Sequence, residues 1–495
     1  MNTSSGAQYY LFAINTYYGT VQAYTTISGT ASGQWPASVC GYVTVPDGYL
    51  TFSANNAIQR QALLQISPGG AVYVTFANFP ENSMNNGWIF GYQLSGTSFT
   101  RTLQASPTPT GTGGGFWGSG AGPAADATSG PEAGSIFTAT GNGTFQLNNV
   151  GPFKDYGDSL LRLSPSNGFW PPADSYTPWD VYSYVGETPP PNPQQCSTLC
   201  QCDEDLSSGG VLVVPSAYSY QCTGGNCNAV INADKQSNIY VANQSNLGGY
   251  NSAGGNNIEA VLTPCHTTNP CEPVDDYQGY WGSPAYWYDG TYNWIFYSAT
   301  DNTEKDAPFP ILGYELSTSS AAPPVPQSPS ATSTYWDTNL PTPAVMDVGF
   351  CNYSPTSSVS SNFNGNGTVI PSSGVVWAIE NPNHYNGLPP YNDCAGPDNQ
   401  HAVLHAFCAT TVNAPNNPCG SGSPNPDSTA LTQIYTSTNN VRTAQISKPV
   451  PFLPPVISNG LVYVGTGAWE TNPYAEVDVF GPCSVNGSTG CIDKP

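Results

Sequence analysis

The sequence predicts an all-β fold, a β-propeller of about six to eight four-stranded blades with long disulfide-stapled loop insertions. The first observation is a phrase that recurs along the chain, in which a small or polar residue precedes a short run of Val, Ile or Leu around an aromatic residue. It occurs at residues 71–75, 135–139, 238–242, 293–297, 374–378 and 460–464. Such runs are too short for helices and are typical of buried strands, and their repetition indicates a propeller or another repeated β array.

The second observation is that most of these runs lie between further strand signals. Shorter strands are predicted at residues 61–66, 283–287 and 455–457, and the last two precede Asp289-Gly290 and Asn459-Gly460. Asp-Gly and Asn-Gly are strong hairpin signals. Third strands are predicted at residues 87–92, 159–163, 311–316, 402–407 and 476–480, and a fourth strand at 431–436. Antiparallel units of three or four strands in series are propeller blades.

The third observation is the content of 47 prolines and 52 glycines, which argues against long helices. Polar, Pro-rich segments at residues 189–193, 317–334 and 413–426 resemble domain linkers in composition. Because the strand pattern resumes after each of them, we interpret them as insertions on one propeller face. We therefore expect residues 1–495 to form a single propeller domain.

Charged residues are scarce and mostly acidic. Asp, Glu, Lys and Arg make up 8% of the chain, against roughly 25% in ordinary soluble domains. The formal net charge is -23. This balance argues against nucleic acid as a partner and favours cations or neutral glycans. The alternative is that the acidity only keeps the protein soluble.

The 14 cysteines favour disulfides and hence an oxidising compartment. Eight of them form close pairs in the sequence, which are our disulfide candidates: Cys222 with Cys227, Cys265 with Cys271, Cys408 with Cys419, and Cys483 with Cys491. A metal site is the alternative, but the chain has four histidines and lacks the CxxCH pattern of covalently attached haem.

The expected location is extracellular or at the cell surface, although the numbered chain begins without the basic and apolar regions of a signal peptide. No apolar stretch approaches the roughly 20 residues that span a bilayer. Six sequons would permit N-glycosylation outside the cell: Asn2, Asn142, Asn243, Asn352, Asn366 and Asn486.

Several short motifs carry a resemblance to a known group. They lie at residues 116–126 (FWGSGAGPAAD), 140–145 (TGNGTF), 155–159 (DYGDS), 176–179 (YTPW), 206–212 (LSSGGVL), 246–250 (NLGGY) and 281–287 (WGSPAYW). In this order they resemble secreted bacterial propellers of the pyrroloquinoline-quinone-like repeat group, from about Tyr9 to Phe480. Members of that group have at least one more blade before the matching segment, so the resemblance implies that part of an N-terminal blade is lacking.

The name of that group implies a quinone cofactor, which the residues of this chain do not favour. Quinoprotein alcohol dehydrogenases resemble one another in a pair of adjacent cysteines, an Asp base and a Ca²⁺ site. Here Gln201 separates Cys200 from Cys202, and the tryptophan docking motif of those enzymes is missing. The resemblance therefore points to a branch outside the dehydrogenases.

The densest acidic cluster, Asp203-Glu204-Asp205, is the candidate metal site. Clustered carboxylates on a stapled loop suit Ca²⁺; the alternative is a solvated acidic loop. Two aspartate pairs, Asp155 with Asp158 and Asp275 with Asp276, are weaker candidates for binding Ca²⁺, and the alternative for them is again a solvated loop. Paired carboxylates would also serve acid–base cleavage of a glycan, but no pair stands out without geometry. We assign no catalytic or cofactor-binding residue.

Two further features have a functional and a structural interpretation. His401 and His405 would share one face of a strand, where they could bind a metal or pack and hydrogen-bond. The aromatic residues between Tyr280 and Trp294 could stack on sugars or form the core and rim of a blade.

The expected function is a structural or binding role outside the cell, with self-association through a surface that carries little local charge. The alternatives are an extracellular enzyme, either quinoprotein-like or active on polysaccharides, and a carbohydrate-binding protein. We also expect the strand around residues 9–14 to pair with the C-terminal unit, within one ring or between subunits, because a bare blade edge exposes unpaired backbone groups.

Overall fold

The computed structural model describes the chain in segments, mostly between residues 48 and 262. The described residues are 2–3, 6–7, 9–15, 20–26, 34–38, 42–45, 48–53, 56–66, 71–79, 85–95, 98–118, 120–126, 132–147, 153–179, 181, 205–215, 220–222, 225–235, 238–253, 255–262, 281–288, 293–298, 311–316, 355–370, 373–380, 402–409, 433–437, 450, 453–467 and 476–481. Within them the structure consists of strands and a three-residue 3₁₀ helix, η4 (Pro165–Asn167). No helix in these segments is long and apolar enough to cross a membrane.

Contacts divide the chain into two compact units. The first unit comprises Met1–Ser219, Asn226–Lys235 and Ile239–Val261, and the second comprises Tyr220–Gly225, Gln236–Asn238 and Leu262–Pro495. We describe each unit by itself. The single-domain expectation for residues 1–495 stays a prediction.

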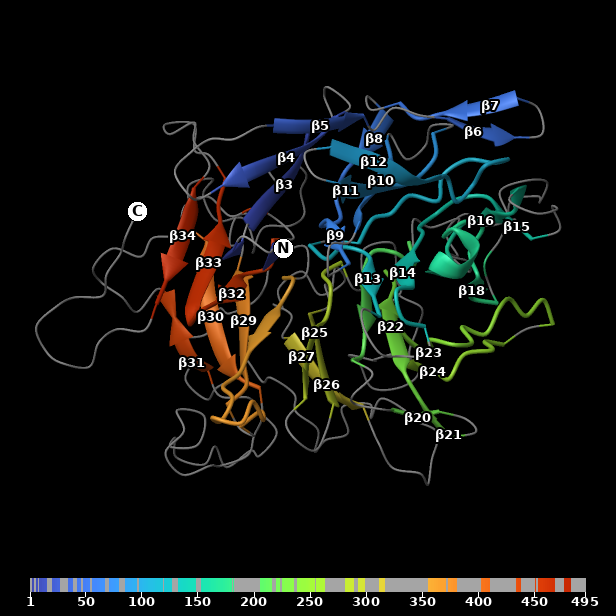
Figure 1. Cartoon of the computed structure of the whole chain (residues 1–495). Coiled ribbons are helices and arrows are strands. Elements are labelled where there is room, and N and C mark those ends of the chain that lie inside the picture. The colour runs from blue at the N-terminus through green and yellow to red at the C-terminus, as the bar shows by residue number, and fades with distance from the viewer. Residues whose placement is uncertain are drawn as a thin grey trace, which may run out of the picture. The chain divides into compact units, whose positions relative to one another are not determined.

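The first large sheet of the first unit has five strands in the order β12-β11-β10-β8, with β9 also paired to β10 (Figure 1). Its strands are β8 (Ala57–Ile58), β9 (Leu64–Gln65), β10 (Ala71–Asn78), β11 (Trp88–Ser95) and β12 (Ser98–Ala105). All eight residues of β10 are buried, as expected for a strand that has a neighbour on each side and a packed core on each face.

Two four-stranded sheets follow in chain order, β13-β14-β17-β18 and β19-β22-β23-β24. Their strands are β13 (Ala124–Ala125), β14 (Ile136–Ala139), β17 (Leu160–Leu163), β18 (Asp174–Tyr176), β19 (Val211–Val213), β22 (Ala229–Ala233), β23 (Ile239–Asn243) and β24 (Ala260–Leu262). A short hairpin of β15 (Phe145–Gln146) with β16 (Asp155–Tyr156) interrupts the first meander. A second hairpin, β20 (Tyr220–Cys222) with β21 (Gly225–Cys227), lies between β19 and β22 in the chain, and its residues 220–225 belong to the second unit.

The N-terminal part of the first unit adds a three-stranded sheet, β3-β4-β5, and two hairpins. The sheet consists of β3 (Tyr9–Asn15), β4 (Thr20–Thr26) and β5 (Gln34–Ser38), and the hairpins of β1 (Asn2–Thr3) with β2 (Gly6–Ala7) and β6 (Tyr42–Val45) with β7 (Gly48–Thr51). β3 pairs with β4 along its whole length, from Tyr9 opposite Thr26 to Asn15 opposite Thr20. The expected pairing of this strand with the C-terminal unit stays a prediction.

The second unit has three sheets in chain order, β25-β26-β27, β28-β29-β30-β31 and β32-β33-β34. Their strands are β25 (Ala285–Tyr288), β26 (Asn293–Ser298), β27 (Ile311–Leu316), β28 (Ser358–Ser360), β29 (Val375–Glu380), β30 (Val403–Cys408), β31 (Gln433–Thr436), β32 (Val456–Ser458), β33 (Leu461–Gly465) and β34 (Val477–Phe480). All pairings given for these strands are antiparallel.

Successive sheets pack face to face within each unit. In the first unit, Tyr73 and Ile89 of one sheet share a core with Leu161 and Leu163 of the next. The opposite face of that second sheet, including Phe137, packs against the sheet that contains β23. In the second unit, the sheet of β28–β31 likewise has one face on β25–β27 and the other on β32–β34. Small antiparallel meanders stacked in chain order are the organisation of propeller blades, which supports the predicted fold class.

The strand phrases mark the interior of these sheets. The six recurrent runs lie in β10, β14, β23, β26, β29 and β33, each of which has a strand on both sides. The predicted third strands appear as β11, β17, β27, β30 and β34, and the predicted fourth strand as β31. Asn459 and Gly460, with φ of 52° and 75°, form the predicted tight turn between β32 and β33.

The predicted number of six to eight four-stranded blades is not supported. Within the described residues, four sheets have four or more strands, whereas β3–β5, β25–β27 and β32–β34 have three each. Edge strands such as β13 and β28 are two or three residues long, so they carry too few apolar residues to be counted from the sequence.

The disulfide-stapled insertions also lack support from the structure. Residues 189–193, 317–334 and 413–426 lie outside the described residues. Cys227 and Cys408 are disulfide-bonded, but their partner sulfurs are not among the described side chains. The pairings of these two with Cys222 and Cys419, like those of Cys265 with Cys271 and Cys483 with Cys491, stay predictions.

Candidate functional site

Four loop segments of the first unit meet where its sheets pack together, and we call this place the loop junction: residues 113–118, 140–144, 156–159 and 205–210. Backbone hydrogen bonds join the first two segments, from Gly114 N to Asn142 O (2.7 Å) and from Gly141 N to Gly115 O (2.8 Å). The third segment joins through Asp158 N, which donates to Gly141 O at 2.9 Å. Parts of four of the seven motifs that carry the resemblance therefore lie in the loop junction, at residues 116–118, 140–144, 156–159 and 206–210.

Glycines allow these loops to approach one another. A Cβ atom on Gly143 would lie 2.2 Å from Gly114 N, and one on Gly157 would lie 2.2 Å from Gly143 O. A Cβ on Gly141 would lie 2.0 Å from Oδ1 of Asp205. Real Cβ atoms do not come this close to other atoms, so a side chain at Gly143 or Gly157 would force the backbones apart, and one at Gly141 would displace the Asp205 side chain.

A buried ion pair lies at the loop junction. Oδ1 of Asp205 accepts a hydrogen bond from Asn142 N at 2.7 Å. Nζ of Lys235 lies 2.7 Å from Oδ2 of Asp205, an ion-pair contact without the alignment of a hydrogen bond. The two side chains are only 1% and 5% exposed. A charge this deeply buried is tolerated because an opposite charge lies beside it.

Asp155, which lies in β16 just before the third segment, and Asp158 of the junction are also held by donors of the protein. Asp155 accepts a hydrogen bond from the backbone N–H of Thr110 at 2.9 Å and another from the Thr110 hydroxyl. Burial raises the pKa of Asp155, and these bonds oppose that shift. Oδ1 of Asp158 accepts from Leu206 N at 3.2 Å. These carboxylates connect loops of neighbouring sheets.

Asp126, at the end of β13, differs from these aspartates. It is 5% exposed, and its Oδ2 atom has no hydrogen-bond partner among the described residues. Burial raises the pKa of Asp126, and the negative charge of Glu132 raises it further. A carboxyl in such surroundings keeps its proton to a higher pH than an exposed one.

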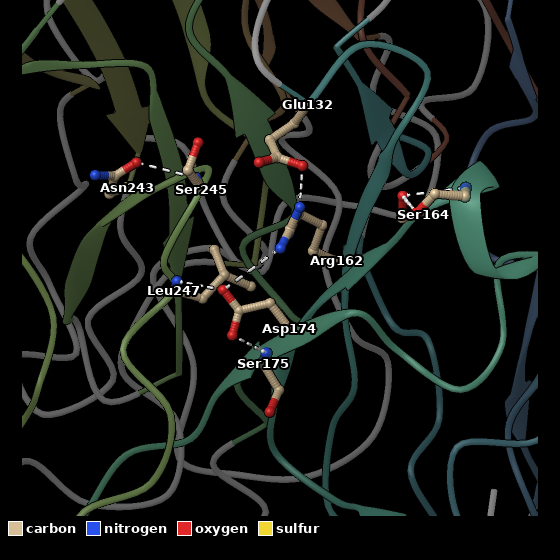
Figure 2. A network of polar contacts seen from close by, with 9 residues as sticks. Glu132, Arg162, Ser164, Asp174, Ser175, Asn243, Ser245 and Leu247 are labelled. Carbon is tan, nitrogen blue, oxygen red and sulfur yellow. Dashed lines mark hydrogen bonds and ion pairs between the residues drawn. The ribbon is translucent and has the colours of Figure 1, made fainter.

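A second polar network lies beside β17 and β18, and Figure 2 shows it. Arg162 of β17 and Asp174 of β18 are register partners, and their Nη2 and Oδ2 atoms are 4.0 Å apart. Nη1 of Arg162 makes a closer ion pair with Glu132. Asp174 also accepts from the backbone N–H groups of Ser175 and Leu247, both at 2.8 Å. The network connects β18 to the loop that follows β23.

The predicted Ca²⁺ cluster is only partly described. Asp203 and Glu204 lie outside the described residues, and both oxygens of Asp205 contact groups of the protein. Among the described residues, no group of three or more His, Cys, Asp or Glu side chains is arranged to hold a metal ion. The Ca²⁺ site stays a prediction, and Asp275 and Asp276 also lie outside the described residues.

Two of the histidine and aromatic candidates, His405 and Trp287, contribute to packing. His405 is 2% exposed in β30, and its ring stacks on Phe407 with centroids 6.0 Å apart. His401 lies outside the described residues. Trp287, from the aromatic run, is 4% exposed in the core between β25–β27 and β28–β31. Its interpretation as blade core therefore holds.

The sequence analysis did not single out the buried Lys235 or the partly buried Arg162. Lys235 and Arg162 are two of only nine basic residues in the chain. In a chain with 32 acidic residues, a basic residue in or next to a strand run is expected to have an acidic partner. The positions of Lys235 and Arg162 in the sequence could therefore have predicted their ion pairs. The guanidinium of Arg60, which lies 5.7 Å from the ring centroid of Trp117, was missed in the same way.

No known protein family matches the chain, and no curated protein matches it. Solved structures similar to it include a quinohemoprotein alcohol dehydrogenase from Pseudomonas putida HK5, at 11% identity and a TM-score of 0.42 over 93% of this chain and 61% of that one. The chain thus spans about three fifths of the length of that enzyme. A quinohemoprotein alcohol dehydrogenase from Comamonas testosteroni is 12% identical, with a TM-score of 0.40 over 95% of this chain and 73% of that one.

A third similar structure is an α-L-arabinanase from Penicillium chrysogenum in complex with arabinobiose. It is 12% identical, with a TM-score of 0.34 over 89% of this chain and 96% of that one. These TM-scores are too low to carry an argument, so the assignment of blades rests on the sheets described above.

Proposed function

We propose that this chain is a non-catalytic extracellular or cell-surface protein, whose blade-like sheets serve a structural or binding role and which associates with copies of itself. The observation that carries the proposal is the use of the buried carboxylates. Asp158 and Asp205, which are buried, each accept a hydrogen bond from a backbone N–H of another loop. The partly buried Asp174 accepts from the backbone N–H groups of Ser175 and Leu247. A general acid or base must instead present an oxygen to the substrate.

The composition supports self-association. With 8% charged residues, the surface must be largely Asn, Ser, Thr, Gln and Tyr, which form hydrogen bonds without strong local repulsion. Electron microscopy and light scattering of the native protein test this part. We expect particles larger than one chain, and a monomer at all concentrations would overturn it.

The disulfides of Cys227 and Cys408 support an exported protein. Alkylation without reductant, followed by mass spectrometry, should find few free thiols among the 14 cysteines. Alkylation of most of them would contradict both the disulfides and the proposed location.

Asp126 supports a second candidate function, hydrolysis of polysaccharides. A buried carboxyl with a raised pKa is the form that a general acid of a glycosidase takes, and Glu132 is a second carboxyl close enough to raise that pKa. Release of reducing sugars from neutral polysaccharides tests it, with Asp126→Asn as the matched variant. Activity that disappears in this variant would establish the enzyme in place of our first proposal.

Quinone-dependent oxidation is tested separately. We expect no alcohol oxidation when pyrroloquinoline quinone, Ca²⁺ and an artificial electron acceptor are added, because the adjacent cysteines of quinoprotein dehydrogenases are missing. Stoichiometric quinone uptake coupled to turnover would overturn this expectation.

A further inference from the structure

Trp179 is exposed at the end of a well-anchored segment of the first unit. The strand β18 ends at Tyr176, which is fully buried between two sheets. Thr177 then donates to Gly249 O at 3.2 Å, and Gly249 N donates back to Ser175 O at 2.9 Å. Trp179 follows two residues later and is 48% exposed. The backbone that leads to this indole is therefore fixed, although its side chain lies at the surface.

The chain is anchored again directly after the tryptophan. Val181 is 4% exposed and packs with Phe145, and Tyr250 packs against this small cluster. The rings of Phe145 and Tyr250 meet edge to face, with centroids 4.8 Å apart. A tryptophan held between two buried anchors loses little conformational entropy when a ligand stacks on it.

Asn256 is attached to the same segment. Its Oδ1 accepts from the hydroxyl of Tyr176 at 2.8 Å and from the backbone N–H of Trp179 at 3.2 Å. Because a backbone N–H only donates, the oxygen of the carboxamide must face Trp179. The amide NH₂ group is thus on the other side of the carboxamide, and Asn256 is an exposed residue. A donor of fixed orientation accompanies the indole.

The loop that carries Asn256 is uncharged and internally braced. Residues 249–257 contain no Asp, Glu, Lys or Arg. Asn251 closes the loop on itself, since its amide donates to Gly255 O at 3.2 Å and its side-chain oxygen accepts from Ala253 N at 3.1 Å. The surroundings of Trp179 thus offer hydrogen bonds without a charged group on this loop.

We propose that Trp179 and Asn256 form a binding site for a neutral glycan. The indole would take the apolar face of a pyranose ring, and the NH₂ group of Asn256 would donate to a sugar hydroxyl. A polyanionic glycan is disfavoured because the chain carries a net charge of -23. The proposal rests on the binding role proposed above and names its ligand class.

Affinity gel electrophoresis of the full chain in hydroxyethyl cellulose, xyloglucan, galactomannan or polygalacturonate tests the site. We expect at least one neutral polymer to retard the protein and Trp179→Ala to weaken that binding about tenfold. Asn256→Asp keeps an oxygen for Tyr176 and Trp179 but removes the NH₂ donor, so it should weaken binding at an unchanged melting temperature. Phe363→Ala, which removes a 60% exposed aromatic residue of the second unit, is the control and should bind like the wild type.

Three results would overturn the proposal: no retardation by any neutral polymer, equal losses in Trp179→Ala and Phe363→Ala, or stronger retardation by polygalacturonate. The same preparations are examined by light scattering. If Trp179→Ala dissociates the self-associated protein, the tryptophan is a contact between copies and the glycan site is wrong. If self-association persists without glycan binding, only the glycan site fails.

Discussion

At the scale of single residues, the sharpest consequence concerns Lys235. Removing its ammonium leaves the buried carboxylate of Asp205 without a counter-charge. We expect Lys235→Met to lower the free energy of unfolding by about 3–5 kcal/mol. Calorimetry or urea unfolding of the purified variant measures the loss.

Two variants complete the test of this ion pair. Lys154→Met, the same change at a partly exposed position, should alter stability by about 0.5 kcal/mol or less. The double variant Asp205→Asn/Lys235→Met should be more stable than Lys235→Met alone, because the Asn oxygen can still accept from Asn142 N. A double variant no better than the single one would show that the loss comes from packing of the lysine stem.

Asp126 makes stability depend on pH in the opposite direction from a salt-bridged carboxylate. Its pKa is raised in the folded protein, so the folded state binds the proton more tightly than the unfolded chain. The contribution of Asp126 to the free energy of unfolding is therefore lost as the pH rises from the ordinary aspartate pKa, about 3.9, through the raised pKa of the folded protein. Asp126→Asn should exceed the wild type in stability at pH 7 and equal it near pH 3, as measured by urea unfolding across that range.

Asp174→Asn is the control for this effect. Its carboxylate accepts two backbone N–H bonds and lies beside Arg162, so loss of the charge should lower stability at pH 7. If Asp126→Asn is destabilised at pH 7 in the same way, the Asp126 carboxylate has a partner that we have not identified.

The residue scale is also where the sequence predicted least. Asp155, Asp158 and Asp205 could be named as a surplus of carboxylates, but their roles depend on backbone N–H groups of loops up to 63 residues away. No short motif encodes such a distance. The roles of His405 and Trp287 were easier to predict. Both lie in strand runs, where the alternation of side chains favours packing over ligand binding.

At the scale of elements, the glycines of the loop junction support a prediction. Gly143→Ala places a methyl group within 2.2 Å of Gly114 N, so one loop must move. We expect it to cost about 1–3 kcal/mol of unfolding free energy. Gly365→Ala is the matched control, because open space surrounds that glycine, and its effect should stay within about 0.5 kcal/mol. If Gly143→Ala and Gly365→Ala change the unfolding free energy equally, the loops of the junction can move apart without loss of stability.

Internal strands could be predicted from the sequence because a strand buried on both faces, such as β10, consists mostly of apolar and aromatic residues. Edge strands such as β13 pair on one side only, and β13 is two residues long. Such short strands leave no recognisable pattern in the sequence, so the number of strands in each sheet could not be predicted. The loop junction could not be predicted for another reason. Some of its glycines, such as Gly143, lie in motifs of the resemblance, but the contact between Gly113 and Gly143 joins two loops that are separated by strands β13 and β14.

At the scale of the whole molecule, the stacking of sheets explains how a chain with few charges remains folded. The sheets β13-β14-β17-β18 and β28-β29-β30-β31 are each covered on both faces by their neighbours in the chain, so apolar residues of both faces contribute to stability. Within the first unit, the N-terminal sheet β3-β4-β5 contacts the following sheet through β5 and β12.

Deletion of residues 1–15 tests the contribution of that sheet. It removes β3, which pairs with β4 over seven residues, and so leaves the N–H and C=O groups of β4 without partners on that side. Unpaired edges lower stability and promote aggregation. Deletion of residues 1–8 is the matched control, because it removes β1 and β2 but keeps β3. We expect the longer deletion to lower the melting temperature and to change the oligomeric state seen by light scattering, and the shorter one to do neither. If both truncated chains melt and associate like the full chain, β3 contributes neither to the fold nor to self-association.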